Sequence, residues 1–175
     1  MLVSDWHEEP ISKSHNRAEF DCGDDALNEF IRQHARKSHE KGGSKTFCAI
    51  SNATPNQILG FYSLSPASIE FSKAPEIIKR GLAKYEVPLF RLGRLAVDIR
   101  LQGQGLGGQL LVAAGKRCLL AAQSVGGVGL LIDAKNAGVK SWYEAYGAIR
   151  LADEELSLIL PMATIADVLK QAGQI

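Results

Sequence analysis

Cysteine is scarce in this sequence of 175 residues. The three cysteines, Cys22, Cys48 and Cys118, are far apart and form no CxxC pair. This pattern argues against a disulfide framework and a zinc site, and favours reduced thiols. Residues 1–10 are acidic and lack the basic and apolar regions of a signal peptide. These absences predict a cytoplasmic protein.

Strong net charge and long apolar runs are also missing. Lysine and arginine number 20 against 19 acidic residues, for a net charge of +1. No overall field therefore draws the chain to nucleic acid or membrane, and any such affinity needs a local patch. No apolar run approaches the roughly 20 residues of a membrane-spanning helix. The length predicts one domain over residues 1–175, with no membrane association.

A glycine-rich segment is the most informative feature that is present. An apolar run, Leu95-Ala-Val, ends at Asp98, and a helical pattern begins directly after the glycines. Closely spaced glycines let backbone N–H groups converge, and the positive end of a following helix points to the same place. A flexible joining loop is the alternative. We expect a phosphate-bearing cofactor to bind at Gln102, Gly103, Gln104, Gly105, Leu106, Gly107 and Gly108.

The spacing of the glycines narrows the choice of cofactor. Gly103-x-Gly105-x-x-Gly108 matches the dinucleotide fingerprint, but the acidic residue expected about 20 positions later is missing. A P-loop would need Gly-Lys-Ser/Thr where the chain has Gly108-Gln-Leu. The remaining pattern, Gln102-x-x-Gly105-x-Gly107, resembles the pyrophosphate-binding motif of the GNAT acetyltransferases, whose cofactor is acetyl-CoA.

Hydrophobic periodicity predicts a mixture of helices and strands. Adjacent strands joined by short turns favour a mixed, mostly antiparallel sheet flanked by helices, an α+β fold, or α/β in looser usage. Helices are expected at residues 24–41, 72–85, 106–122, 139–146 and 164–171. Strands are expected at residues 46–50, 58–64, 130–133 and 156–160, together with one that leads into the glycine loop.

Further segments carry a more specific resemblance. Residues 136–147, with Asn136, Trp142 and Tyr143, are similar to the GNAT element in which an asparagine precedes an aromatic–tyrosine pair. Residues 20–30, 60–64 and 93–98 resemble a narrower group, the GNAT toxins of bacterial toxin–antitoxin pairs, which acetylate aminoacyl-tRNA and stop translation. The likeness runs from about residue 20 to 162. It implies a single N-acetyltransferase domain that uses acetyl-CoA and no metal.

The resemblance assigns roles to single residues. It places Tyr143 beside the sulfur of coenzyme A, where a phenol of pKa about 10 can donate a proton to a thiolate whose conjugate pKa is about 8.5. Tyr146 is the rival donor. The backbone of Leu95, Ala96 and Val97 would pair with the pantetheine arm and could supply the oxyanion donor. Asn136 would bind the same arm, and its alternative is a turn-forming asparagine.

No general base stands out among the histidines and acids. An α-amine, with a pKa of about 8, has less need of a general base than a lysine amine, with a pKa of about 10.4. The absence therefore slightly favours aminoacyl-tRNA over a lysine side chain as the acceptor.

A basic patch is expected along the first helix and the turn after it. Such a patch can bind tRNA phosphates, although an ordinary solvated helix face is the alternative. Its members are Arg32, Arg36, Lys37, Lys41 and Lys45, and Arg91 and Arg94 are expected on the same side.

The toxin resemblance also implies a protein partner. We expect a small antitoxin, a ribbon-helix-helix DNA-binding dimer with a flexible tail, and a homodimer of the toxin is left open. Two other functions remain in view. One is a GNAT acetyltransferase of a small-molecule amine or a protein N-terminus, and the other is a non-catalytic acetyl-CoA-binding module.

Overall fold

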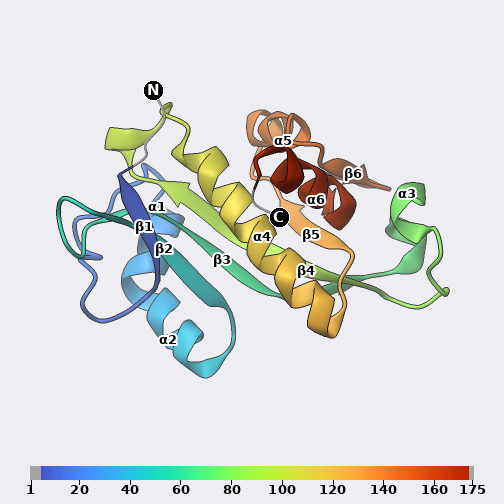
Figure 1. The fold of residues 1–175 in the computed structure, drawn as a ribbon, viewed down its shortest axis with the longest axis horizontal. Coiled ribbons are helices and arrows are strands. Elements are labelled where there is room, and N and C mark those ends of the chain that lie inside the picture. Colours follow the sequence, from blue (N-terminus) through green and yellow to red (C-terminus); the bar gives the residue numbers. More distant parts are fainter. Residues whose placement is uncertain (1–4, 174–175) are drawn as a thin grey trace. The chain divides into compact units, whose positions relative to one another are not determined.

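The computed structural model describes residues 5–173 (Figure 1); residues 1–4 and 174–175, the ends of the predicted domain, lie outside them. The sheet has seven strands in the order β1-β2-β3-β4-β5-β7-β6. β4 and β5 are parallel, whereas β1–β2, β2–β3, β5–β7 and β6–β7 are antiparallel. The predicted α+β fold is confirmed. The strands are β1 (Trp6–Pro10), β2 (Lys45–Ser51), β3 (Ile58–Ile69), β4 (Val87–Val97), β5 (Gly129–Asp133), β6 (Ile149–Leu151) and β7 (Glu154–Pro161).

Most helices lie where hydrophobic periodicity predicted them. The helical character expected over residues 72–85 is found only in the short segments η2 (Phe71–Lys73) and α3 (Glu76–Lys79), because Pro75 and Gly81, with φ of +79°, interrupt a longer helix. The other helical segments are α1 (Asp25–Glu29), η1 (Phe30–His34), α2 (Ala35–Lys41), η3 (Ile99–Leu101), α4 (Leu106–Val125), α5 (Ala137–Glu144) and α6 (Met162–Gln171).

The chain forms two compact units. Unit 1 consists of Met1–Ser65 and Gly93–Ala113, and unit 2 of Pro66–Leu92 and Ala114–Ile175. β3, β4 and α4 each contribute residues to both. That the whole chain acts as one domain stays a prediction, and the two units are described separately below.

The core of unit 1 lies between the sheet and the segment α1–η1–α2. Phe30, Ile31 and Ala35 from the helical segment pack with Phe61 of β3 and Ala96 of β4. Alternation along the strand turns Gly60 to the opposite face, where α4 lies. A Cβ atom at Gly60 would be 2.8 Å from the Ala96 carbonyl oxygen and 2.9 Å from Leu110 Cδ1. Glycine is therefore needed here for β3 and α4 to approach so closely.

The first predicted helix, residues 24–41, is confirmed with one irregularity. The side chain of Asp24 caps it by accepting from the Leu27 N–H at 3.2 Å, and Gly42, with φ of 80°, ends it. Between α1 and α2 the turn η1 is a π-helix. Such a turn widens the backbone without any signature in side-chain periodicity, and it often occurs at functional sites.

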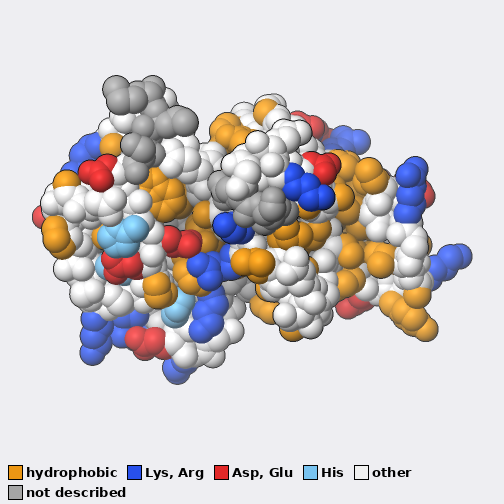
Figure 2. Space-filling view, viewed as in Figure 1, with side chains coloured by type: hydrophobic (Ala, Val, Ile, Leu, Met, Phe, Trp, Pro, Cys, Tyr) orange, Lys and Arg blue, Asp and Glu red, His pale blue; other side chains and the backbone are white. Residues whose placement is uncertain are grey.

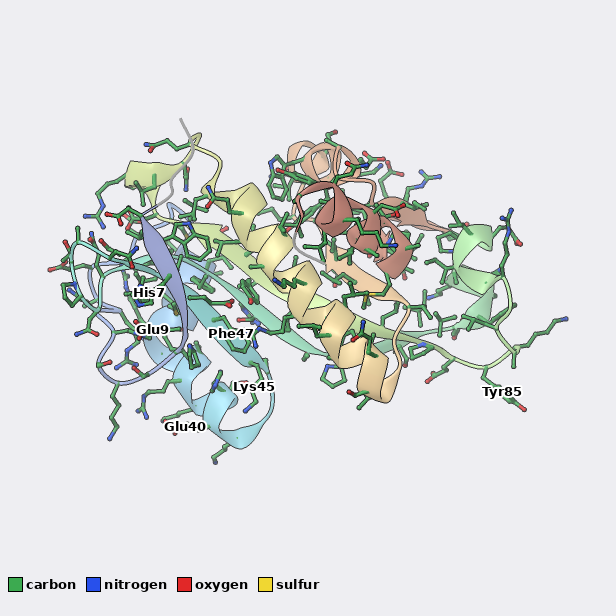
Figure 3. All side chains as sticks on the ribbon, in the orientation of Figure 1. His7, Glu9, Glu40, Lys45, Phe47 and Tyr85 are labelled. Carbon is green, nitrogen blue, oxygen red and sulfur yellow. The ribbon has the colours of Figure 1, made fainter. Side chains whose placement is uncertain are left out.

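Strand β1 was not predicted, and its polar side chains tie it to unit 1. The indole Nε1 of Trp6 donates to Gln109 Oε1 of α4 at 2.7 Å. His15, which is buried, accepts from the Ser12 N–H at Nδ1 and therefore donates from Nε2 to Glu9 at 3.0 Å. His7 contacts the other oxygen of Glu9 (Figure 3). Sequence analysis found no such histidine–carboxylate grouping, because the register of β1 was unknown.

Unit 2 has its own core. Val87 and Leu89 of β4 pack with Leu131 of β5 and Ile159 of β7. Helix α6 lies against the second half of α4, where a Cβ atom at Gly115 would be 3.0 Å from Ile165. This core supports α5, which follows β5 and carries Tyr143.

Candidate functional site

The glycine loop, residues 102–108, lies in unit 1 and runs from the end of η3 into the first turn of α4. Gly103 and Gly105 have φ of 80° and 87°, in the left-handed region that favours glycine. Both are exposed, whereas Leu106 is buried and begins the 20-residue helix α4. An exposed loop free of side-chain bulk, directly before a long helix, fits a pyrophosphate. The residues present therefore suit acetyl-CoA.

The side chain of Gln102 holds this loop in place. Its Nε2 donates to the Val97 carbonyl and to the Cys22 carbonyl, both at 2.9 Å. Gln104 donates more weakly to the Arg100 carbonyl, at 3.4 Å. The amide of Gln102 thus connects the end of β4 with the segment that precedes α1.

Asp98, at the end of β4, is a buried carboxylate that sequence analysis did not single out. It is 1% exposed and accepts from Arg100 Nε at 2.9 Å, Arg100 Nη2 at 3.0 Å and the Asp21 N–H at 3.3 Å. Burial alone would raise the pKa of Asp98, but the hydrogen bonds from Arg100 and Asp21 outweigh it and hold the pKa below its usual range. The sequence signal that could have identified Asp98 was an acidic residue placed directly at the end of an apolar run.

Leu95, Ala96 and Val97 form the last residues of β4, directly before Asp98. Ala96 is buried in the core of unit 1, and alternation turns Leu95 and Val97 to the face that carries α4. Their predicted backbone contacts with the pantetheine arm stay a prediction.

Asn136 belongs to unit 2 and caps α5. Its Oδ1 accepts from the Val139 N–H at 2.9 Å, which is the local structural role that was the alternative in the sequence. The residue is exposed, and its predicted contact with the cofactor stays a prediction.

Tyr143 lies on α5 in unit 2, within a group of three aromatic rings. It is 7% exposed, and its ring lies edge-on to Trp142 at a centroid distance of 4.9 Å. Tyr146, the rival donor, is also 4.9 Å from Trp142 but less buried. Burial raises the pKa of Tyr143 to about 12. Its hydroxyl therefore stays protonated near neutral pH and can act as an acid.

The predicted basic residues are not all in one unit. Arg32, Arg36, Lys37, Lys41, Lys45 and Arg94 lie in unit 1, and Figure 2 shows Lys and Arg side chains gathered over α2, whereas Arg91 lies in unit 2 beside Asp133. Some have local partners: Arg36 pairs with Glu40 at 2.8 Å, and Lys45 donates to the His39 carbonyl at 2.8 Å near the end of α2 (Figure 3). Lys37 and Lys41 are exposed.

A hollow of about 440 Å³ opens in unit 1 between the segment α1–η1–α2 and the parts of β3 and β4 that carry Ser65 and Arg94. We call it the Arg94 hollow. The guanidinium of Arg94 lies over the ring of Phe30, 3.8 Å from its centroid. Sequence analysis missed this site because separate segments of the chain form it. Its lining includes Glu29, Phe30, Ser38, Ser44, Ser65 and Arg94.

In residues 5–173 no helix is long and apolar enough to cross a bilayer. Within the same range, no three His, Cys, Asp or Glu side chains gather as the ligands of a metal ion would. The three cysteines are free, and burial raises the pKa of both Cys48 and Cys118 to about 12.

No protein-family model matches the sequence. The chain is similar to the tRNA-acetylating toxin of Mycobacterium tuberculosis (strain ATCC 25618 / H37Rv), with 32% identity over 152 residues, which cover 87% of this chain and 89% of the relative. A tyrosine-to-phenylalanine mutant of KacT has a similar structure, with a TM-score of 0.88 and 30% identity over 94% of this chain and 99% of KacT.

AtaT is similar in two solved states. Its complex with acetyl-methionyl-tRNAfMet has a TM-score of 0.87 at 30% identity, covering 94% of this chain and 99% of AtaT. A tyrosine-to-phenylalanine mutant bound to acetyl-CoA and to the C-terminus of the antitoxin AtaR has a TM-score of 0.80 at 30% identity, covering 96% of this chain and all (100%) of that one. The chain therefore belongs to the GNAT toxins of toxin–antitoxin systems, the family of the tRNA-acetylating toxins.

Proposed function

We propose that this chain is an acetyl-CoA-dependent N-acetyltransferase that acetylates the α-amino group of aminoacyl-tRNA. It acts as a translation-inhibiting toxin that an antitoxin neutralises. The observation that carries the proposal is likeness over nearly the whole chain to a tRNA-acetylating toxin and to AtaT in complex with acetyl-methionyl-tRNAfMet. The exposed glycine loop before α4 supports it, because it suits the pyrophosphate of acetyl-CoA.

Acetyl-CoA supplies the acetyl group as an activated thioester. The backbone N–H groups of residues 103–108 hold its pyrophosphate, helped by the positive end of α4. The backbone of Leu95, Ala96 and Val97 pairs with the pantetheine arm, and Asn136 binds the same arm. Gln102 serves this site by fixing the loop, since its side-chain amide is engaged with two carbonyls.

Tyr143 is the proton donor for the departing thiolate. Its side chain is buried on α5, and within residues 5–173 its hydroxyl has no hydrogen-bond partner that would compete for its proton. Its raised pKa of about 12 keeps the proton in place until the thiolate forms. The α-amine of the acceptor needs no dedicated base, because a large fraction of it is neutral near pH 8.

The pH dependence of the rate tests this division of roles. We expect kcat/KM for aminoacyl-tRNA to rise until the α-amine is deprotonated, at a pKa of about 8, and then to stay level to about pH 10. The plateau follows because Tyr143, with a pKa of about 12, is still protonated there. Initial rates of acetyl transfer give this profile. A fall in rate with an apparent pKa near 9 would contradict an acid of such high pKa, provided that the substrate stays intact.

The acceptor RNA contacts the basic residues of unit 1. Lys37 and Lys41 are the clearest phosphate contacts, because they are exposed on α2. Arg32, Arg36, Lys45 and Arg94 extend this surface, and Arg91 of unit 2 adds a further contact. The reaction takes place in the cytoplasm, where charged tRNA is used for translation.

The neutralising partner is an antitoxin of the ribbon-helix-helix type with a flexible acidic tail. Supporting this, AtaT binds the C-terminus of its antitoxin, AtaR. A flexible tail loses conformational entropy on binding, but it can cover the large basic surface described above.

Substrate choice and salt dependence decide between the proposal and a small-amine acetyltransferase. We expect acetylation of charged tRNA to be much faster than that of free amino acids, polyamines or peptides, and to weaken steeply with salt. Replacing Lys37 and Lys41 with alanine should lower the salt slope of tRNA binding by about one unit per lost phosphate contact. Initial rates at several salt concentrations measure both effects.

A double variant in unit 2, Arg80→Ala with Lys84→Ala, provides the control. Both residues are exposed and lie outside the proposed surface, so charge removal there should leave the salt slope unchanged. Equal rates with free amines and charged tRNA, with little salt dependence, would instead support the alternative, an acetyltransferase of a small-molecule amine or protein N-terminus.

A further inference from the structure

The Arg94 hollow presents a flat cation on an aromatic ring. Phe30 is buried, and the Arg94 guanidinium lies 3.8 Å above its centroid. Arg94 is nevertheless exposed, and among residues 5–173 no carboxylate pairs with it. Its planar group is thus held in position by the ring while part of it faces the hollow. Unpaired RNA bases commonly stack on such guanidinium planes.

A carboxylate lines the same hollow. The side chain of Glu29 is 60% exposed, and the Nε2 atom of His34 lies 3.8 Å from Glu29 Oε1. A carboxylate accepts a hydrogen bond from the exocyclic amino group of cytosine or adenine, whereas it repels the O4 atom of uracil. It also repels a phosphate. The presence of both Arg94 and Glu29 in the lining therefore favours a base over a free anion.

Hydroxyl groups complete the lining. Ser38 and Ser44 lie with their Oγ atoms 2.9 Å apart, and Ser65 is the last residue of β3 that belongs to unit 1. Their hydroxyls can donate or accept along the edge of a base. The volume of about 440 Å³ lies within the usual range of small-ligand sites.

We infer that the Arg94 hollow binds an unpaired RNA base that carries an exocyclic amino group, which stacks on Arg94 and donates to Glu29. This inference rests on the proposed function, since tRNA ends in an unpaired CCA sequence whose bases all carry such a group. Arg94 also directly precedes Leu95, Ala96 and Val97, the strand segment assigned to the pantetheine arm. The residue that stacks on the base is thus adjacent in the sequence to the segment that we propose holds the acetyl donor.

Binding of two trinucleotides tests the inference. CCA and UUU carry the same phosphates, but no base of UUU carries an exocyclic amino group, so a difference between them reports base recognition. We expect wild-type protein to bind CCA about tenfold more tightly, the effect of about 1.4 kcal/mol from one charge-assisted hydrogen bond. Nuclear magnetic resonance titration measures both affinities. Equal affinities, no binding of CCA at millimolar concentration, or full displacement of CCA by inorganic phosphate would overturn the inference.

Two substitutions separate recognition from a structural role. Glu29→Gln should reduce the preference for CCA to within about twofold and strengthen UUU binding, because an amide can donate to uracil O4. Arg94→Lys should weaken both trinucleotides about tenfold and keep the preference, because lysine retains the charge but offers no plane for stacking. The matched controls, Glu76→Gln and Arg80→Lys in the exposed α3 region, should change neither affinity. A preference for CCA that survives in Glu29→Gln would remove Glu29 from the site and overturn the inference.

Acetylation of charged tRNA by the same wild-type preparation distinguishes failure of the proposed function from failure of the inference about the hollow. If CCA is preferred but charged tRNA is not acetylated, the proposed function fails and base recognition by the hollow stands. If charged tRNA is acetylated but CCA and UUU bind alike, the proposed function stands and the inference about the hollow fails.

Discussion

Replacing Tyr143 with phenylalanine is expected to lower the turnover of aminoacyl-tRNA acetylation by about 10²–10⁴-fold, the usual contribution of a general acid. The affinity for acetyl-CoA should stay nearly the same, because the substitution removes one hydroxyl and little volume. Folding should also be preserved, since the ring and its contact with Trp142 remain. Single-turnover kinetics together with calorimetry of acetyl-CoA binding measure the two quantities separately.

Tyr146→Phe is the matched control for this substitution. Tyr146 lies at the same 4.9 Å centroid distance from Trp142 but is more exposed. The Tyr146→Phe substitution should cost little activity if Tyr143 is the donor. A loss below about threefold in Tyr143→Phe, or a large loss in Tyr146→Phe alone, would move the role of donor to Tyr146 or to water.

Bacterial growth gives an independent measure of the same change. Strong expression of the wild-type chain alone should arrest growth, co-expression of its antitoxin should restore growth, and the Tyr143→Phe variant should be harmless. Unimpaired growth with soluble, active wild-type protein would count against the toxin function.

Replacing Gly105 with valine is expected to abolish measurable acetyl-CoA binding. Gly105 has φ of 87°, where a β-branched residue costs about 1–3 kcal/mol of strain. The new side chain would also occupy the approach of the pyrophosphate to the backbone N–H groups. Calorimetric titration with acetyl-CoA measures the loss, and thermal unfolding reports the strain.

Gly126→Val separates strain from loss of the binding surface. Gly126 has nearly the same φ, 86°, and a Cβ atom there would meet nothing within 4 Å. It lies after α4 in unit 2, away from the glycine loop in sequence. Both variants should lose similar stability, but only Gly105→Val should lose acetyl-CoA. Unchanged affinity in Gly105→Val would contradict the assignment of the loop.

The parts that sequence analysis predicted correctly depend on local signals. Asp24 and Gly42 mark the ends of the first helical segment through capping and a left-handed backbone, which are properties of single residues. The glycine loop could be located because the residues that shape it are consecutive in the chain. Long apolar patterns likewise identified α4 and β5.

The parts that were missed depend on contacts between distant segments. Strand β1 is short and polar and ends in Pro10, so only its pairing with β2 reveals it. The Arg94 hollow needs Phe30 and Arg94 to meet across the core of unit 1, which no periodicity indicates. The burial of Asp98 is equally a tertiary property, since only its surroundings show that Arg100 and Asp21 satisfy it.

The two hydrogen bonds donated by the Gln102 amide have a kinetic consequence. They hold the glycine loop against the carbonyls of Val97 and Cys22 without any contribution from a ligand. A loop that is already ordered loses little conformational entropy when acetyl-CoA arrives, so encounter and not loop closure should limit the association rate. Acetyl-CoA can then bind before the acceptor does, so that acetyl transfer does not have to wait for the loop to close.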